Sequence, residues 1–245
     1  MRRLVIWDAP VRLVHGCFIV LIPALWWTAN VGMVDLHKKI GLIMLALIVF
    51  RLGWGLVGSS TARFATFVHG PKAIRAYIQT LRRTDSATPA VAVVGHNPLG
   101  GLSVIALLAI LAGQVSLGLV AQDTDGVASG PLNHLVSWDV AVAAGKLHGV
   151  LFYALLSFIA LHVLAILYYR IAKGDDLVTA MVTGRRAFDT ATRAPVIAPV
   201  WRAAFVAALA VALAVWIAWG LPPWAARFPW DQPPTAEGVD DQSYM

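Results

Sequence analysis

The chain has 245 residues, of which 59% are hydrophobic and only 13% are charged, and its mean hydropathy is +0.72. Soluble domains carry about 25% charged residues, so this composition indicates a membrane protein. The net charge of +6 does not call for a nucleic acid as partner. The distribution of basic residues about a membrane accounts for that charge, and anionic lipid head groups are the expected partner.

Five apolar runs come close to the length of about 20 residues that a helix needs to cross a bilayer. Lipid offers no hydrogen-bond partner for backbone amides, so each run is predicted to be a helix. The fold class is therefore an all-α membrane protein, with predicted spans at residues 11–30, 37–58, 99–120, 147–170 and 200–220.

The first run competes with a cleavable signal peptide, because Arg2 and Arg3 precede it. Polar residues within "WDAPVRLVH" and the lack of a small-residue cleavage site favour a retained helix. Asp8 is its predicted N-cap, with Pro10 in the first turn. Cys17 is the single cysteine, which excludes an internal disulfide and a c-type haem attachment motif.

The basic residues predict the orientation, since short cytoplasmic loops accumulate Lys and Arg. The N-terminal segment and the loops after the second and fourth spans, together with the span ends that adjoin them, hold fourteen of the 19 basic residues. The opposite side holds Lys38, Lys39, Lys146 and Arg227 among many acids. We therefore expect a multi-pass protein of a bacterial inner membrane, with a cytoplasmic N-terminus and a periplasmic C-terminus.

The loops differ in composition. The cytoplasmic loop 59–98 contains "FATFVHGPKAIRAYIQTLRR", which predicts a short amphipathic helix on the membrane surface. The outer loop 121–146 is rich in Gly, Ser and Asp and suits a docking surface or a lid. Residues 173–199 form a second cytoplasmic connector, and the Pro/Trp-rich tail 221–245 is expected to hold little regular structure.

Four histidines lie within the predicted spans, where a titratable side chain is costly and points to a function. His148 and His162 are fourteen residues apart on one helix, which corresponds to about 21 Å and to nearly the same face. The predicted topology places His15 at the depth of His162 and His37 at the depth of His148. Neutral histidines that bond to neighbouring helices are the alternative for any one of them.

Two histidines at each of two depths are what two b haems require, because each low-spin iron takes two axial nitrogens from facing helices. Zinc would need three or four ligands close together. Arg51 lies fourteen residues after His37, at the depth of the inner pair. A haem propionate or a quinone site would pair with its charge, whereas the alternative is a side chain that snorkels to the cytoplasmic interface.

The remaining histidines are weaker candidates. His96, in "GHNPLGG", is interpreted as part of a cap or turn. His69 and His134 are interpreted as ordinary polar residues, although His134 is also a candidate for a docking or quinol pocket. Gln114 and Ser116 are expected to form interhelical hydrogen bonds.

Several motifs in order resemble the bacterial cytochrome b561 and nickel-iron hydrogenase b-type cytochrome superfamily. They are "WDAPVRLVH", "LHKKIGLIMLALIVFRLGWGLVG", "FVHGPKAIRAYI", "GHNPLGGL" and the helix with both His148 and His162. The resemblance covers roughly residues 5–185 and implies a four-helix transmembrane bundle with two b haems. It maps the axial ligands onto His15, His37, His148 and His162, and the family arginine onto Arg51. His15-Gly16 departs from the His-Trp that is frequent in the family.

Three segments are therefore predicted: a dihaem domain at 1–185, a connector with a fifth transmembrane helix at 186–220, and a periplasmic tail at 221–245. The expected function is electron transfer between quinone or quinol and a periplasmic cytochrome c, dehydrogenase or hydrogenase. A free-standing quinone reductase that uses a small donor such as superoxide is the alternative. An anchoring subunit without haem and a transporter fit the sequence less well, because all four ligands are present and no paired broken helices occur.

Overall fold

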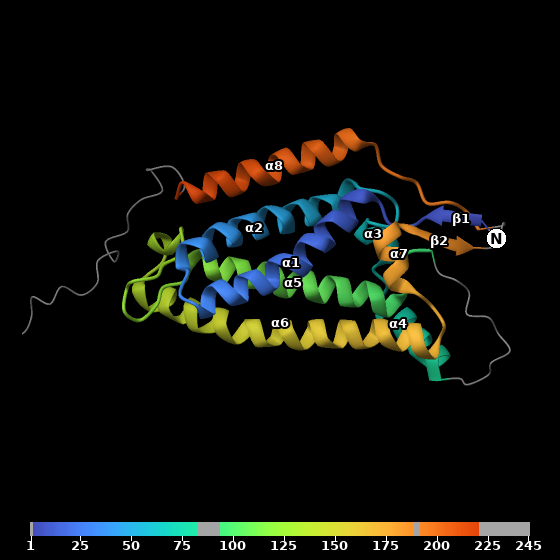
Figure 1. The fold of residues 1–245 in the computed structure, drawn as a ribbon, viewed down its shortest axis with the longest axis horizontal. Coiled ribbons are helices and arrows are strands. Elements are labelled where there is room, and N and C mark those ends of the chain that lie inside the picture. Colours follow the sequence, from blue (N-terminus) through green and yellow to red (C-terminus); the bar gives the residue numbers. More distant parts are fainter. Residues whose placement is uncertain (1, 83–93, 189–191, 221–245) are drawn as a thin grey trace, which may run out of the picture.

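Five long helices form the body of the protein (Figure 1). The structure, a computed structural model, describes residues 2–82, 94–188 and 192–220. The five helices are long and apolar enough to cross a membrane: α1 (Ala9–Asn30), α2 (Val34–Val57), α5 (Pro98–Val120), α6 (Trp138–Ala172) and α8 (Val200–Ala218). The prediction of five helical spans in a multi-pass membrane protein is thus confirmed.

The largest difference from the predicted bounds concerns α6. This helix has 35 residues and begins at Trp138, whereas the predicted span begins at residue 147. Its first turns contain Asp139 and Lys146, which interrupt the apolar run but not the helix. Hydropathy detects the part of a helix that lipid surrounds, and it misses a helical extension that projects beyond the membrane.

The two ends of the bundle are built differently. The sheet end holds the strands β1 (Arg2–Val5) and β2 (Arg185–Phe188) with the short helices α3 (Phe64–Phe67), α4 (Pro71–Arg82) and α7 (Leu177–Thr183). The loop end holds residues 121–137, including the 3-10 helix η1 (Asn133–Leu135). The short helix predicted in the loop after the second span is present as α4. The sheet end is the one that the charge distribution predicts to be cytoplasmic.

The two strands were not predicted. They pair antiparallel, with Leu4 opposite Arg186, and so join the N-terminus to the connector after α6. Leu4 and Phe188 are buried in a cluster that also includes Trp54 of α2 and Val206 of α8. The predicted boundary at residue 185 therefore falls inside a strand, and residues on both sides of it share one core.

Two N-caps fix where α1 and α5 begin. The Asp8 carboxylate accepts a hydrogen bond from the Val11 amide at 2.9 Å, with Pro10 in the first turn, as predicted. Its second oxygen accepts from Trp54 Nε1 at 2.9 Å, which ties α1 to α2. Asn97 caps α5 by accepting from the Gly100 amide at 2.8 Å.

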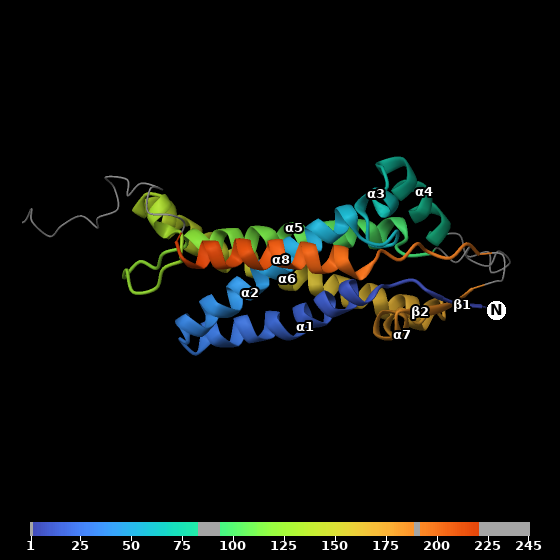
Figure 2. The ribbon, with the colours of Figure 1, turned by 90° about the horizontal axis from the view of Figure 1, so that it is seen from above.

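The fifth span, α8, lies along the outer side of α2 (Figures 1 and 2). The approach is close, since a Cβ at Gly53 would stand 2.8 Å from Val206 Cγ1. Helix α2 also contacts α1 and α5, and α5 packs along α6. A layer of Met44, Ile48, Leu111 and Leu155 is buried between α2, α5 and α6. The tail 221–245, with Arg227, and Arg83 lie outside the described residues.

Candidate cofactor-binding sites

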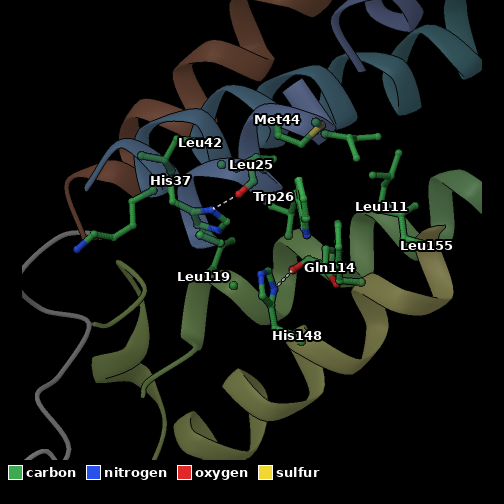
Figure 3. Close-up of a pocket in the computed structure, with 18 of the residues that line it drawn as sticks. Leu25, Trp26, His37, Leu42, Met44, Leu111, Gln114, Leu119, His148 and Leu155 are labelled. Carbon is green, nitrogen blue, oxygen red and sulfur yellow. Dashed lines mark hydrogen bonds between the residues drawn. The ribbon is translucent and has the colours of Figure 1, made fainter. Parts of the chain in front are cut away.

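His37 and His148 meet at the loop end of the bundle (Figure 3). His37 lies in the first turns of α2, and His148 lies in α6. Their ring centres are 6.2 Å apart and the ring planes are inclined by 80°. The structure thus brings together two side chains that are 111 positions apart along the chain and that the predicted topology places at the same depth.

Backbone carbonyls orient both imidazoles through the same ring atom. Nδ1 of His37 donates to the Leu25 carbonyl oxygen at 3.0 Å, and Nδ1 of His148 donates to the Gln114 carbonyl oxygen at 2.8 Å. A donor at Nδ1 fixes the tautomer in which Nε2 carries the free lone pair, which is the form that binds a metal. The Thr28 hydroxyl is a further neighbour, 3.4 Å from Nδ1 of His37.

Both histidines line a cavity of about 270 Å³ between α1, α2, α5 and α6. Its other walls are mainly aliphatic and aromatic, and Pro131 of the loop end is among the lining residues. Gly41 and Gly149 line it, and a Cβ built on either would meet no protein atom within 4 Å. These glycines leave the backbone open to a flat ligand. Gln114 Oε1, also in the wall, is buried without a hydrogen-bond partner among the described residues.

His15 and His162 form the second pair, toward the sheet end. His15 lies in α1, which begins at the sheet end, and His162 lies in the second half of α6. The two imidazoles are within electrostatic range of each other. Nδ1 of His162 is 3.4 Å from the Ser103 hydroxyl of α5. The structure thus places the two predicted pairs at two levels, with the buried layer around Leu155 between them.

Arg51 is turned into the protein rather than out to the interface. Only 5% of the residue is exposed, and its guanidinium carbon lies 5.4 Å from the centre of the Phe64 ring. Nη1 reaches the Ala62 carbonyl oxygen at 3.5 Å, the limit of a hydrogen bond. Among the described residues no carboxylate lies within 4.0 Å of it. The charge of Asp8 acts on Arg51 at longer range.

The weaker candidates lie elsewhere. His134 is in η1 and is not among the residues that line the loop-end cavity. His69 Nδ1 bonds to the Phe67 carbonyl oxygen at 2.7 Å. His96 precedes the cap residue Asn97, and its ring packs between Trp7 and Phe67, with ring centres 4.5 Å from each. Burial, with the positive charge of Arg51 as a smaller cause, lowers the pKa of His96 to about 3.

Sequence reasoning missed the groups that orient the metal-binding candidates. The carbonyls of Leu25 and Gln114 have no sequence signature, because every residue carries the same group and only the packing of helices selects one. Gln114 does form an interhelical hydrogen bond, but through its backbone carbonyl, and its side-chain Oε1 has no partner among the described residues.

A comparison with protein-family models now identifies the family. The model described as prokaryotic cytochrome b561 matches residues 6–184. The chain belongs to the prokaryotic cytochrome b561 family. No curated protein and no solved structure matches it. The resemblance that the sequence motifs indicated is thereby confirmed, and the chain is a b-type membrane cytochrome with a role in electron transfer.

The loop-end site of this cytochrome b561 protein suits a b haem. Two imidazoles on one iron have their ring centres about 6 Å apart, since each metal–nitrogen bond is about 2 Å and each nitrogen lies about 1 Å from its ring centre. The observed separation of 6.2 Å matches this value. The free Nε2 atoms, the apolar walls and the open glycines fit the same group.

Proposed function

We propose that the chain binds two b haems, one between His37 and His148 and one between His15 and His162. It then passes electrons across the membrane between quinone or quinol and a periplasmic redox partner. The observation that carries the proposal is the loop-end pair. Each Nδ1 atom of this pair is hydrogen-bonded to a backbone carbonyl, and the two ring centres are 6.2 Å apart.

Helix α6 is the shared support of both sites. His148 and His162 lie on one continuous helix, and their separation of fourteen residues corresponds to about 21 Å. A bound haem iron supplies the one-electron redox change. The protein holds the ligands, excludes water with an apolar layer between the levels, and sets the local charge.

Arg51 supports a haem with an anionic group at the sheet-end level. A buried guanidinium without a paired carboxylate is costly, and a propionate would provide the missing anion. Arg51 is therefore proposed to contact a haem propionate, with a quinone as the competing ligand. The same end of the bundle carries the exposed or half-exposed basic side chains Arg2, Arg3, Arg63, Lys72, Arg75, Arg170, Lys173, Arg185, Arg186 and Arg202, which supports a cytoplasmic sheet end.

The test is haem content together with a reduced-minus-oxidised spectrum of purified protein. The wild type is expected to contain two b haems per chain. His148→Ala and His37→Ala are each expected to lose one haem, the same one in both variants. His134→Ala is the matched control, because it removes a loop-end histidine that does not line the cavity. Two haems retained in His148→Ala would refute the ligand assignment.

A periplasmic partner is favoured over a small-molecule donor by the structure of the loop end. Residues 121–137 are held by backbone bonds such as Gly130 N–H to the Ala121 carbonyl at 2.7 Å and Leu132 N–H to the Leu119 carbonyl at 2.8 Å. They form a defined surface over the cavity, which suits docking of a protein. Co-purification of a redox protein from native membranes supports this version. Superoxide-dependent quinone reduction by the isolated chain supports the alternative.

A further inference from the structure

His96 has an enclosed imidazole nitrogen that belongs to neither of the two proposed ligand pairs. Its ring packs, tilted, against Trp7, which precedes α1, and Phe67 of α3. Nδ1 is buried and has no hydrogen-bond partner among the described residues. An enclosed polar atom without a partner costs about 1–3 kcal/mol, so its retention calls for a reason.

The ring is neutral at physiological pH, because burial lowers the pKa of His96 to about 3. A neutral imidazole offers one N–H donor and one acceptor nitrogen. His96 can therefore offer a hydrogen bond to a ligand at this place without adding a second positive charge near Arg51.

Helix α3 links His96 to Arg51. The Arg51 guanidinium lies over the Phe64 ring, at 5.4 Å from its centre. The ring centres of Phe64 and Phe67 are 5.8 Å apart, and those of Phe67 and His96 are 4.5 Å apart. Arg51 and His162 are both within electrostatic range of His96. One cation, one neutral donor and one predicted haem ligand thus converge at the sheet end.

Asp8, the acid whose charge acts on Arg51, is already occupied. Both oxygens of Asp8 hold other donors, the Val11 amide and Trp54 Nε1, each at 2.9 Å. Asp8 is thus engaged in holding α1 against α2. A carboxylate supplied by a ligand would satisfy both Arg51 and His96, since each carboxylate oxygen accepts more than one hydrogen bond.

We propose that His96 donates a hydrogen bond through Nδ1 to the carboxylate of the sheet-end haem that Arg51 neutralises. This inference rests on the proposed function, because it needs a haem between His15 and His162. His96 is a positioning residue in it, since it acts on the iron only through the carboxylate. A quinone carbonyl at the same atom is the competing ligand, but it leaves the charge of Arg51 without an anion.

Three substitutions separate the hydrogen bond from the packing. His96→Phe keeps an aromatic ring between Trp7 and Phe67 and removes both nitrogens. His96→Asn retains an amide donor at the position of Nδ1. His96→Gln moves the amide outward, toward the position of Nε2, and serves as the matched control for polarity.

The measurement is a redox titration of both haems in the purified protein, with haem counted per chain. His96→Phe is expected to keep two haems and to shift the oxidised-to-reduced ratio of the sheet-end haem about threefold to tenfold toward the oxidised form. That shift is roughly 30–60 mV for one electron. The cause is the lost hydrogen bond, which leaves more negative charge near the iron. His96→Asn restores the potential and His96→Gln does not. The other haem, identified as the one lost in His148→Ala, keeps its potential.

The outcomes separate the two proposals. A wild-type protein without two haems refutes the proposed function itself. Two haems with unchanged potentials in His96→Phe refute the inference and leave the proposed function standing. An altered KM for quinol with unchanged potentials assigns His96 to a quinone instead. If His96→Phe fails to assemble, the comparison of His96→Asn with His96→Gln decides, and equal potentials in these two variants overturn the inference.

Discussion

Gly118 on α5 determines where the His148 ring can lie. A Cβ at Gly118 would stand 3.0 Å from His148 Cε1 and 3.3 Å from Nδ1. Ordinary contact begins at 3.4 Å, so the ring must shift by about 0.4 Å to accept an alanine. The same ring is held by the Gln114 carbonyl at 2.8 Å, so the shift strains or breaks that hydrogen bond.

We expect Gly118→Ala to weaken binding of the loop-end haem about 10- to 100-fold, the usual effect of losing an outer-shell contact to a ligating histidine. The assay is the rate of haem transfer from detergent-solubilised protein to an excess of apomyoglobin. Two kinetic phases are expected, and Gly118→Ala should accelerate the one that belongs to the haem lost in His148→Ala.

Gly113→Ala is the matched control on the same helix. Its new Cβ would meet Leu151 Cδ2 at 3.3 Å, the end of a flexible side chain that can move aside. Both alanines favour the helix over glycine by about 0.5–1 kcal/mol, so a general effect on α5 would appear in both variants. Equal rates of haem transfer in Gly118→Ala and the wild type would refute the reasoning, because His148 would then not depend on its observed position.

Three further predictions concern stability and the loop end. Burial lowers the pKa of His96 to about 3, whereas a histidine in the unfolded chain titrates near 6.5. The contribution of neutral His96 to the free energy of unfolding is therefore fully present above pH 6.5 and is lost as the pH falls from 6.5 toward 3. Thermal unfolding in detergent should show that the free energy of unfolding falls by as much as about 2 kcal/mol between pH 6.5 and pH 5. His96→Phe should reduce this fall, and an identical pH profile in that variant contradicts the assignment of the pH dependence to His96. Asp8→Ala removes a helix cap and the partner of Trp54 Nε1, with an expected cost of about 2–4 kcal/mol in chemical unfolding. Its control, Asp35→Ala, removes an exposed acid paired with Lys38 at 3.5 Å and should cost less than about 1 kcal/mol, so comparable costs would count against the cap. Gly130→Ala places a Cβ against the carbonyls of Gly118 and Leu119, so limited proteolysis should cut loop 121–137 faster than in the wild type. The control is Gly70→Ala, whose Cβ meets no atom within 4 Å. Unchanged cleavage in Gly130→Ala would show that the loop does not pack against these carbonyls.

The sequence by itself determined the membrane class, the five spans and the pairing of histidines by depth. These features follow from short-range physics. An apolar run of sufficient length must form a helix in lipid, and the fixed rise of a helix turns residue number into depth. His37 and His148 could therefore be paired before their 6.2 Å approach was known. The cap at Asp8 was also predictable, since its bond to the Val11 amide spans three residues.

Only the tertiary structure decided which groups surround those histidines. Three features depend on how helices and connecting segments pack: the carbonyls of Leu25 and Gln114, the burial of Arg51, and the tilted aromatic rings around His96. The contact between Trp7 and His96 spans 89 positions along the chain. The strand pair between β1 and β2 joins residues that are 180 or more positions apart, and four-residue strands carry too little local pattern to reveal it. Depth along a helix is a local property, whereas the face that a neighbouring helix presents is set by the packing of the whole chain.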